Sequence, residues 1–490
     1  MKKFSKVLSI LLSVVLVISS FYLLYQVIRL NVLPSKFLFP LTIGVVVLDA
    51  IFILLLVYFS KNVVSKIICI VLTLFICVAS CMGGYYISKT QGALSNITNV
   101  AKHAKNTVSV IVKESSSIKD KSQLNGVSVG SLRLNEQGSK KALKELSNEG
   151  IVLNQTEYDS MTALLEAFYN GEVDSIIINE SSRSQILDME AYSNFDSNTR
   201  VVYQTSYKVK NNDSATSVSD ITSKPFNLLI SGSDTRGGFD ENGRSDVIMV
   251  ATVNPKTHTI LLTSVPRDFY VTTACDAGDG CMQGALDKIT HTGIHGTNTT
   301  KRTVEQLLGI EINYTFKVGF DTVTDLVDAL GGVDVYVEPG YAVHNEYINV
   351  KEGVNHLYGK EALDYARERY AYSEGDRQRT KNQQQVLMGI VKEATKPSVI
   401  TNYAAIMDTI ANTFSTTMSN EEITDLIKYQ LNNNPTWKME QYMVDGTGDT
   451  LMCAELGDAA SVMVPDQSTV KMAKDKINAV LAGKSSEDIK

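Results

Sequence analysis

The sequence has few residues of the kinds that build metal clusters or disulfide scaffolds. Its 490 residues include 6 cysteines and 6 histidines. It has no Cys-x-x-Cys pair and no His–Cys cluster, which argues against a zinc site. Cys69, Cys77 and Cys81 lie in an apolar run and are expected to pack as small apolar residues. Cys275 and Cys281 bracket the turn CDAGDGC, and their spacing fits either a local disulfide or two free thiols.

The sequence also lacks an excess of positive charge. It has 46 lysines and arginines against 53 acidic residues, which gives a net charge of −7. A chain with this balance is not an electrostatic nucleic-acid binder as a whole, so any basic site must be local. A helix-turn-helix pattern is absent as well. We therefore expect no nucleic acid among its partners.

Three long apolar runs occupy the first part of the chain. Val7–Ile28 and Ile67–Ile87 carry no charge, and Phe37–Phe59 carries only Asp49. Each run is long enough to cross a hydrocarbon core of about 30 Å as a helix. The pattern predicts a three-span transmembrane region at 1–88. We interpret Asp49 as a carboxyl that Gln26, or a tyrosine or serine on a neighbouring helix, satisfies, and a functional role is the alternative.

The basic residues near these runs predict their orientation. Five lysines lie on one side of the predicted membrane (Lys2, Lys3, Lys6, Lys61 and Lys66), and two basic residues lie on the other (Arg29 and Lys36). Positive residues are enriched in cytoplasmic loops, so the N-terminus is predicted to be cytoplasmic. The expected location is therefore the cell membrane, with several spans and a large extracytoplasmic C-terminal region.

The remainder of the chain alternates strand-like and helix-like runs, which predicts an α/β fold. We expect a small accessory α/β domain at 89–210, entered through a polar connector at 89–106 and built on a largely parallel sheet. Its expected role is that of a spacer or an interaction domain. A polar linker is expected at 211–224. A mixed α/β domain with a central sheet flanked by helices should follow at 225–490, with a mostly helical C-terminal part.

Arginine is concentrated in one short stretch, Tyr365–Gln383. The whole chain has twelve arginines, and four of them lie here: Arg367, Arg369, Arg377 and Arg379. The planar guanidinium holds phosphate oxygens bidentately, whereas the lysine ammonium does not. The stretch therefore indicates phosphate binding. The alternative is a solvated charged face on a surface helix.

Two aspartates flank a glycine-rich loop earlier in the chain. Asp234 follows the strand-like run NLLISG, and Asp246 opens the run DVIMV. Carboxylates that act together with substrate phosphates are the usual way in which proteins hold Mg²⁺, although ordinary turn chemistry is the alternative. Arg244 lies two residues before Asp246, and Arg267 follows a strand-like run and a proline. Together with the arginine-rich stretch, these residues predict a Mg²⁺ and pyrophosphate site.

The same segments carry a family resemblance. The motifs are GSDTRGGFDENGRSDVIMVATVNP, LLTSVPRD, DKITH, TVEQLLG, FDTVTDLVDALGGVDVYV and LDYARERYAYSEGDRQRTKNQQQVL, in this order within about 225–395. The chain resembles the LytR-CpsA-Psr family, in particular its membrane-anchored streptococcal capsule-locus branch. The resemblance implies a Mg²⁺-dependent extracytoplasmic phosphotransferase. Such an enzyme moves a glycopolymer, here expected to be capsular polysaccharide, from a polyprenyl-pyrophosphate carrier to peptidoglycan, and a pyrophosphatase side activity is a further expectation.

The resemblance also implies roles for individual residues. The expected metal ligands are Asp234 and Asp246, and the expected catalytic residues are Asp234, Asp246 and Arg267. The expected pyrophosphate-binding residues are Arg244, Arg267, Arg367, Arg369, Arg379 and Gln383. Asn382 stands where many family members have a second arginine, and Arg377 is assigned no role. The runs FKVGF and LVDAL are candidates to line an apolar groove for the lipid, although core packing is their default role.

Two alternatives from other functional classes remain at this point. The first is a membrane-anchored regulator of capsule production, and the second is a scaffold that binds the polymer without turning it over. A scaffold would not need two aspartates beside the arginines. The expected partners are the polyprenyl-pyrophosphate-linked polysaccharide, the peptidoglycan acceptor, the lipid membrane and other capsule-assembly proteins.

Overall fold

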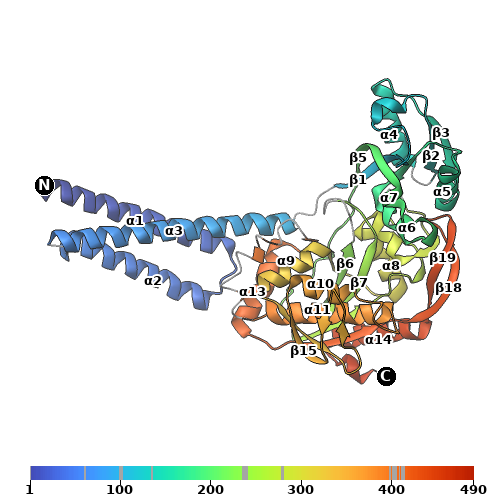
Figure 1. The fold of residues 1–490 in the computed structure, drawn as a ribbon. Coiled ribbons are helices and arrows are strands. Elements are labelled where there is room, and N and C mark those ends of the chain that lie inside the picture. Colours follow the sequence, from blue (N-terminus) through green and yellow to red (C-terminus); the bar gives the residue numbers. More distant parts are fainter. Residues whose placement is uncertain are drawn as a thin grey trace.

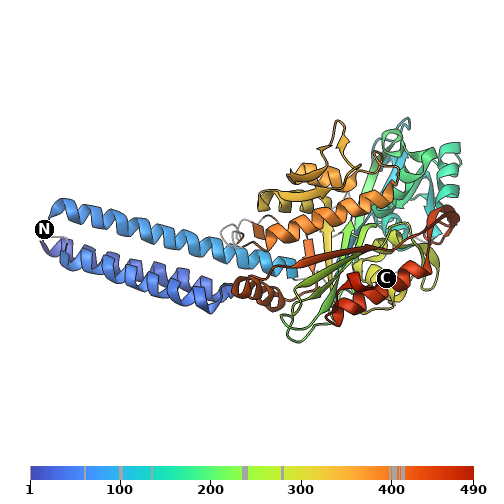
Figure 2. The ribbon, with the colours of Figure 1, turned by 90° about the horizontal axis from the view of Figure 1, so that it is seen from below.

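The structure is a computed structural model. It describes residues 2–59, 62–98, 103–133, 136–233, 241–276, 281–396, 399, 406–407, 409 and 414–489. The N-terminal helices form an elongated bundle that projects from one side of a larger folded part (Figure 1, and Figure 2 from below). Asp234, a predicted metal ligand, lies outside the described residues.

The apolar runs form the helices of the elongated bundle. These helices are α1 (Lys2–Leu30), α2 (Ser35–Leu54) and α3 (Val63–Thr98). Each contains a segment long and apolar enough to span a membrane. Ser20 of α1 donates a 2.9 Å hydrogen bond to the Asp49 carboxylate of α2, so a serine on a neighbouring helix satisfies Asp49, as expected. The polar connector expected at 89–106 contains the end of α3, which continues to Thr98, and the start of the first strand at His103.

The accessory domain is built on a sheet with the strand order β3-β2-β4-β1-β5. Its strands are β1 (His103–Lys113), β2 (Ser128–Leu132), β3 (Asn154–Tyr158), β4 (Ser175–Asn179) and β5 (Thr199–Lys210). Its helices are α4 (Glu136–Asn148), α5 (Met161–Asn170), α6 (Arg183–Asp188) and α7 (Phe195–Asn198).

The largely parallel sheet predicted for this domain is only half right. β2 pairs in parallel with β3 and β4, but β1 is antiparallel to both of its neighbours. Residues 108–112 of β1 are buried one after another, as are all the residues of β4. A strand that is buried on both faces has a continuous apolar sequence whether it pairs in parallel or antiparallel with its neighbours. The sequence pattern therefore could not distinguish parallel from antiparallel pairing.

The central sheet of the second domain has the order β16-β11-β6-β7-β8-β17. Its strands are β6 (Phe226–Ser233), β7 (Ser245–Asn254), β8 (Thr259–Ser264), β11 (Tyr314–Gly319), β16 (Phe414–Thr416) and β17 (Lys438–Met443). Residues 211–225 precede it without a helix or strand and are held against β11, where Val218 N–H donates to the Tyr314 hydroxyl.

Helices cover both faces of the central sheet. On one face, Ile248 and Leu261 of the sheet pack in one core with Val304 of α8 (Thr297–Leu308) and Ile477 of α14 (Gln467–Leu481). On the other face, the core that contains Leu262 also includes residues of α11 (Asp376–Ala394). The prediction of a mixed α/β domain with a helix-flanked sheet is confirmed.

A smaller lobe and an additional helix complete this domain. The lobe contains α9 (Phe320–Leu330), α10 (Gly359–Arg367) and two short antiparallel sheets, β12 (Val333–Val337) with β15 (Gly353–Leu357) and β13 (Val343–His344) with β14 (Asn349–Val350). Helix α13 spans Asn420–Asn433.

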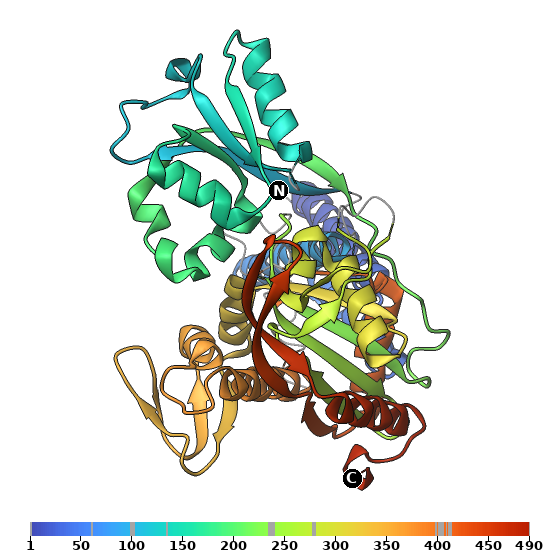
Figure 3. The same cartoon turned by 90° about the vertical axis from the view of Figure 1, so that its right-hand side faces the viewer.

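The C-terminal part is less helical than predicted. β17 forms an edge of the central sheet, and β18 (Gly446–Cys453) pairs with β19 (Asp458–Pro465) in a hairpin. Figure 3 shows this hairpin extending from the central sheet toward the accessory domain. Most of β18 is exposed and carries Gly, Thr and Asp. A strand with little buried apolar surface has no strong alternation, so the prediction failed there.

A short strand pair precedes α8. β9 (Tyr270–Thr272) pairs with β10 (Leu286–Lys288), and the 3-10 segment Ile289–His295 follows. Cys275 and Cys281 in the connection form a disulfide. Of the two arrangements that the sequence left open, the structure contains the bridge.

Candidate functional site

The site is centred on Asp246, at the beginning of β7. β7 and β8 are antiparallel neighbours, so the start of β7 lies beside the end of β8. Arg267 follows β8, and its Nη1 donates a 2.9 Å hydrogen bond to Asp246 Oδ1. The Thr290 hydroxyl lies 3.3 Å from the same oxygen. Only 9% of the Asp246 side chain and 14% of the Arg267 side chain are exposed, so the pair is largely shielded from water.

The electrostatics of this pair favour the charged forms of both groups. Burial alone would raise the pKa of Asp246, but the nearby Arg244 and Arg267 outweigh it and hold the pKa below its ordinary value. Burial opposes the charge of Arg267 as well, yet the attraction of Asp246 keeps the pKa of Arg267 above its usual range. Asp246 is therefore an ionised carboxylate at neutral pH.

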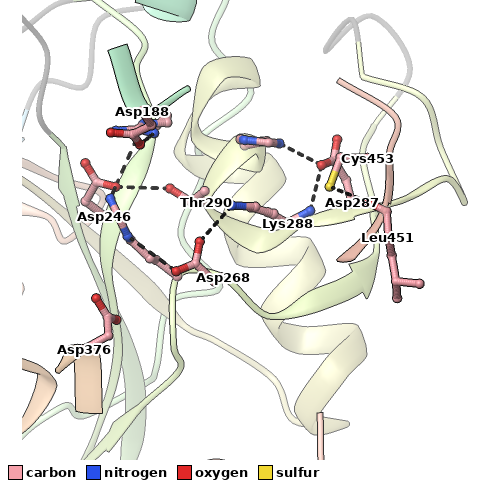
Figure 4. Close-up of polar contacts among 12 residues, drawn as sticks. Asp188, Asp246, Asp268, Asp287, Lys288, Thr290, Asp376, Leu451 and Cys453 are labelled. Atoms are coloured by element: carbon pink, nitrogen blue, oxygen red, sulfur yellow. Dashed lines mark hydrogen bonds and ion pairs between the residues drawn. The ribbon is translucent and has the colours of Figure 1, made fainter. Parts of the chain in front are cut away.

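Arg379 comes to the site from the arginine-rich stretch. It lies in the first turns of α11 and forms an ion pair with Asp376. Burial lowers the pKa of Arg379, and the positive charges of Arg267 and Arg369 act in the same direction. Gln384 of α11 donates a 2.9 Å hydrogen bond to the Ser264 hydroxyl at the end of β8, so the N-terminal half of α11 lies beside that strand end. Figure 4 shows Asp376 in the left half of the view, below Asp246 and Asp268.

Arg244 completes the group. It immediately precedes β7, and only 8% of its side chain is exposed. Its Nε lies 4.0 Å from Asp246 Oδ1, and its Nη1 donates to Asp188 of the accessory domain. Figure 4 shows Asp188 approaching Asp246 from a separate segment of the chain.

Three buried guanidinium nitrogens in this group lack a hydrogen-bond partner in the described part of the chain. They are the Nε atoms of Arg244, Arg267 and Arg379. A buried donor without a partner is costly, and such atoms in native proteins call for an explanation such as a missing ion. An anionic group with several oxygens would satisfy them. The three side chains thus have the chemistry of a phosphate site.

The other residues of the predicted pyrophosphate set lie less centrally. Arg367 is exposed at the end of α10, and the Arg369 guanidinium lies 4.6 Å from the centre of the Tyr370 ring. Arg369 is close enough to influence the pKa of Arg379. Gln383 is half-buried on α11, one turn after Arg379.

Two neighbours of these residues have structural roles. Asn382 is fully buried, and its amide donates a 3.0 Å hydrogen bond to the backbone oxygen of Tyr365 in α10. It joins the two helices that carry the arginines. Arg377, to which the sequence assigned no role, pairs instead with Asp445 beyond β17. The arginine-rich stretch therefore divides: Arg379 is largely buried at the start of α11, and Arg377 forms an ion pair with Asp445 at the surface.

Sequence reasoning missed several residues around the site. Thr290 lies within the motif DKITH, which was quoted for the family resemblance but given no role. Lys288 of the same motif donates a 3.1 Å hydrogen bond to Asp268, which lies 3.8 Å from Arg267 Nε. Asp188 has no local signal, because it belongs to the accessory domain and precedes Arg244 by 56 residues.

The described residues contain no group of three or more His, Cys, Asp and Glu side chains that could hold a metal. Mg²⁺ commonly binds one or two carboxylates and otherwise takes substrate phosphates and water, so such a cluster is not required. Asp246 is an ionised carboxylate beside guanidinium groups that lack hydrogen-bond partners among the described residues. It therefore has the chemistry of one such carboxylate ligand for Mg²⁺.

An apolar cavity of about 450 Å³ lies away from the arginines. It is bounded by α1, α3 and the turn between α1 and α2 on the membrane side, and by α9, α11 and α13 on the other. Leu326 and Leu330, from the run LVDAL singled out in the sequence, line it. The beginning of α11 carries Arg379, and its last residue, Ala394, also lines the cavity. One helix thus connects the two places.

Comparison with known proteins agrees with the motif pattern. A sequence profile of the LytR_cpsA_psr family matches residues 191–479, which is more than half of the chain and begins within the accessory domain. A relative from Bacillus cereus (strain AH820) is named polyisoprenyl-teichoic acid–peptidoglycan teichoic acid transferase TagU. It is 31% identical over 241 residues, which are 49% of this chain and 76% of the relative.

Two further proteins extend the comparison. A relative of the same name from Bacillus licheniformis is 33% identical over 226 residues, which are 46% of this chain and 70% of the relative. The crystal structure of protein gbs0355 from Streptococcus agalactiae is 26% identical, with a TM-score of 0.46, and the match covers 54% of this chain and 89% of that one. From the profile match and the relatives that are at least 30% identical, the chain belongs to the LytR_cpsA_psr family.

Proposed function

We propose that this protein is a membrane-anchored phosphotransferase that moves a glycopolymer from a polyprenyl-pyrophosphate carrier to peptidoglycan. The observation that carries the proposal is the group of three arginines around Asp246, each with a buried Nε that lacks a hydrogen-bond partner among the described residues. A pyrophosphate offers several charged oxygens to such donors, and arginine forks match their geometry. The names of the TagU relatives support the same class of reaction.

The reaction requires little covalent chemistry from the protein. An acceptor hydroxyl of peptidoglycan attacks the phosphorus next to the polymer, and the bond from that phosphorus to the bridging oxygen breaks. The polymer keeps this phosphorus as a phosphodiester, polyprenyl phosphate leaves, and the proton of the acceptor hydroxyl passes to solvent or to the leaving phosphate. Positioning and charge stabilisation are the principal contributions of the protein to such a transfer. Arg244, Arg267 and Arg379 bind the pyrophosphate and stabilise charge on its oxygens.

Asp246 suits metal binding better than proton abstraction. Its pKa is held below the ordinary carboxyl value, whereas an effective general base has a pKa near the working pH. We therefore assign Asp246 to Mg²⁺, with Asp234 as the second ligand expected from the family pattern. When bound, Mg²⁺ would neutralise charge on the phosphate oxygens. A pyrophosphatase side activity would follow if water replaced the acceptor hydroxyl.

The lipid tail of the carrier needs an apolar place near the membrane. We assign it to the cavity of about 450 Å³ between the membrane helices and α9, α11 and α13. In this arrangement α11 runs alongside the carrier, with Arg379 near the headgroup and Ala394 near the tail. The proposed location has the folded part outside the cell, where peptidoglycan is available, and the proposed polymer is capsular polysaccharide.

The test uses the full-length protein in detergent micelles. A polyprenyl-pyrophosphate oligosaccharide serves as donor and peptidoglycan fragments serve as acceptor, with Mg²⁺ or with EDTA. We expect polymer joined to peptidoglycan with Mg²⁺ and a loss of at least tenfold with EDTA. Arg379→Ala should reduce transfer strongly, and Arg377→Ala should not, because Arg377 pairs with Asp445. Failure of the wild-type protein to attach any polymer would refute the proposed function.

A further inference from the structure

Within the described residues, three groups of contacts join the accessory domain to the second domain. At the tip of the β18–β19 hairpin, the backbone N–H of Met161 donates a 3.0 Å hydrogen bond to the Leu456 carbonyl. Lys105 of β1 forms a 3.3 Å ion pair with Glu241. Asp188, at the end of α6, accepts a hydrogen bond from Arg244. Figure 3 shows the accessory domain, in blue and green, next to the red β18–β19 hairpin.

Two of these contacts fall on residues 241–246, the segment that leads into Asp246. The Glu241 side chain is 8% exposed and accepts a hydrogen bond from the Thr107 hydroxyl of β1 as well as the ion pair from Lys105. On the other side, Lys317 of β11 donates a 2.7 Å hydrogen bond to the Glu241 carbonyl. The accessory domain therefore supports the backbone and one side chain of the phosphate site.

The Arg244 guanidinium lies between carboxylates of two domains. Its Nη1 donates to Asp188, while its Nε faces Asp246 Oδ1 at 4.0 Å. Asp188 binds one edge of the planar fork, so it limits the orientations that the remaining donors can adopt. Asp188 is also the last residue of α6, where the helix dipole disfavours a carboxylate. Helix stability does not account for an aspartate at this position.

We propose that Asp188 is a positioning residue through which the accessory domain becomes part of the phosphate site. It holds Arg244 so that the Nε, which lacks a hydrogen-bond partner in the described residues, faces the place of the pyrophosphate beside Asp246. This inference rests on the proposed function and adds a residue, outside the arginine-rich stretch and the strand ends, that sets the affinity for the carrier. The accessory domain is then more than a spacer.

The test measures KM for the polyprenyl-pyrophosphate donor and kcat, with the full-length protein in detergent. Asp188→Asn keeps the size of the side chain and removes its charge. We expect KM to rise about fivefold, the upper range for a partly exposed ion pair, with little change in kcat. Asp188→Glu should restore most of the affinity. The matched control is Glu190→Gln, a loss of charge two residues away on the same exposed segment.

A double-mutant cycle separates positioning from a structural effect. If Asp188 acts through Arg244, Asp188→Asn should change KM by less than about twofold in an Arg244→Ala background. The proposal is overturned if Asp188→Asn matches the wild-type KM, or if it is equally harmful in both backgrounds. With either result, the proposed transferase function would still hold if Arg267→Ala loses binding of the carrier. Absence of transfer by the wild-type protein would instead remove the proposed function and this inference together.

Discussion

Replacing Arg267 by alanine should separate the binding role of this arginine from its role in stability. The change removes the 2.9 Å hydrogen bond to Asp246 and a buried Nε that lacks a hydrogen-bond partner among the described residues. A charge-assisted hydrogen bond contributes about 1.5–3 kcal/mol, which corresponds to roughly 10- to 150-fold weaker retention of the carrier. Arg267→Lys should recover little of this affinity, because the ammonium lacks the planar fork.

The same change also leaves a buried carboxylate with weaker partners. Asp246 would keep Thr290 at 3.3 Å and Arg244 at 4.0 Å. Breaking a buried pair by removing one partner can cost about 3–5 kcal/mol, and we expect a smaller loss of about 1–3 kcal/mol because Arg244 remains. The double variant Arg267→Ala/Asp246→Asn should recover this stability, since the uncompensated charge is gone, but it should not recover carrier binding.

The assay measures polyprenyl-pyrophosphate retained by purified full-length protein, together with thermal unfolding of each variant. Arg377→Ala is the control, because Arg377 forms its ion pair with Asp445 and is 45% exposed. The reasoning is refuted if Arg267→Ala retains as much carrier as the wild type at an unchanged unfolding temperature. It is also refuted if the double variant recovers both stability and binding, since the arginine would then act only as a partner of Asp246.

Three further predictions concern the metal, pH and the cysteines. Asp246→Ala should reduce polymer transfer far more than carrier retention, measured on the same samples, because it removes a proposed metal ligand and leaves the arginines. Glu440 is buried, which would raise its pKa, but its hydrogen bonds and Lys438 lower the pKa from 4.5 to about 2. That shift corresponds to about 3 kcal/mol of stability, present above pH 4.5 and lost as the pH falls toward 2, and urea unfolding of Glu440→Gln should lack this pH dependence. Mass spectrometry after alkylation without reductant should leave Cys275 and Cys281 unlabelled, and labelling of both would contradict the disulfide.

The core of the site could be predicted because it depends on strand order. Asp246 and Arg267 lie at adjacent ends of two runs that a hairpin connects, and antiparallel pairing of β7 and β8 brings such ends together. The preference for arginine over lysine predicted phosphate binding, and Arg379 of this stretch is one of the three arginines whose buried Nε lacks a hydrogen-bond partner among the described residues. These inferences needed only local pattern and residue chemistry.

Other parts of the site could not be predicted, because they depend on contacts between distant segments. The pairing of Arg244 with Asp188 joins two domains, and Asp188 does not stand out in its own segment. Asn382 was considered a departure from a phosphate-binding pattern, but it is buried and joins α11 to α10. Residue type alone does not separate Arg377 from Arg379. The family resemblance gave Arg377 no role, but its pairing with Asp445 is visible only in the structure.

The most direct test of the central claim follows the phosphorus during transfer. The full-length protein is given a polyprenyl-pyrophosphate donor with a radioactive label on the phosphorus next to the sugar, together with peptidoglycan and Mg²⁺. Our account predicts that the label appears on peptidoglycan with the polymer, in a phosphodiester, and that Arg379→Ala reduces it while Arg377→Ala does not. Polymer on peptidoglycan with all of the label left on the lipid would contradict phosphotransfer.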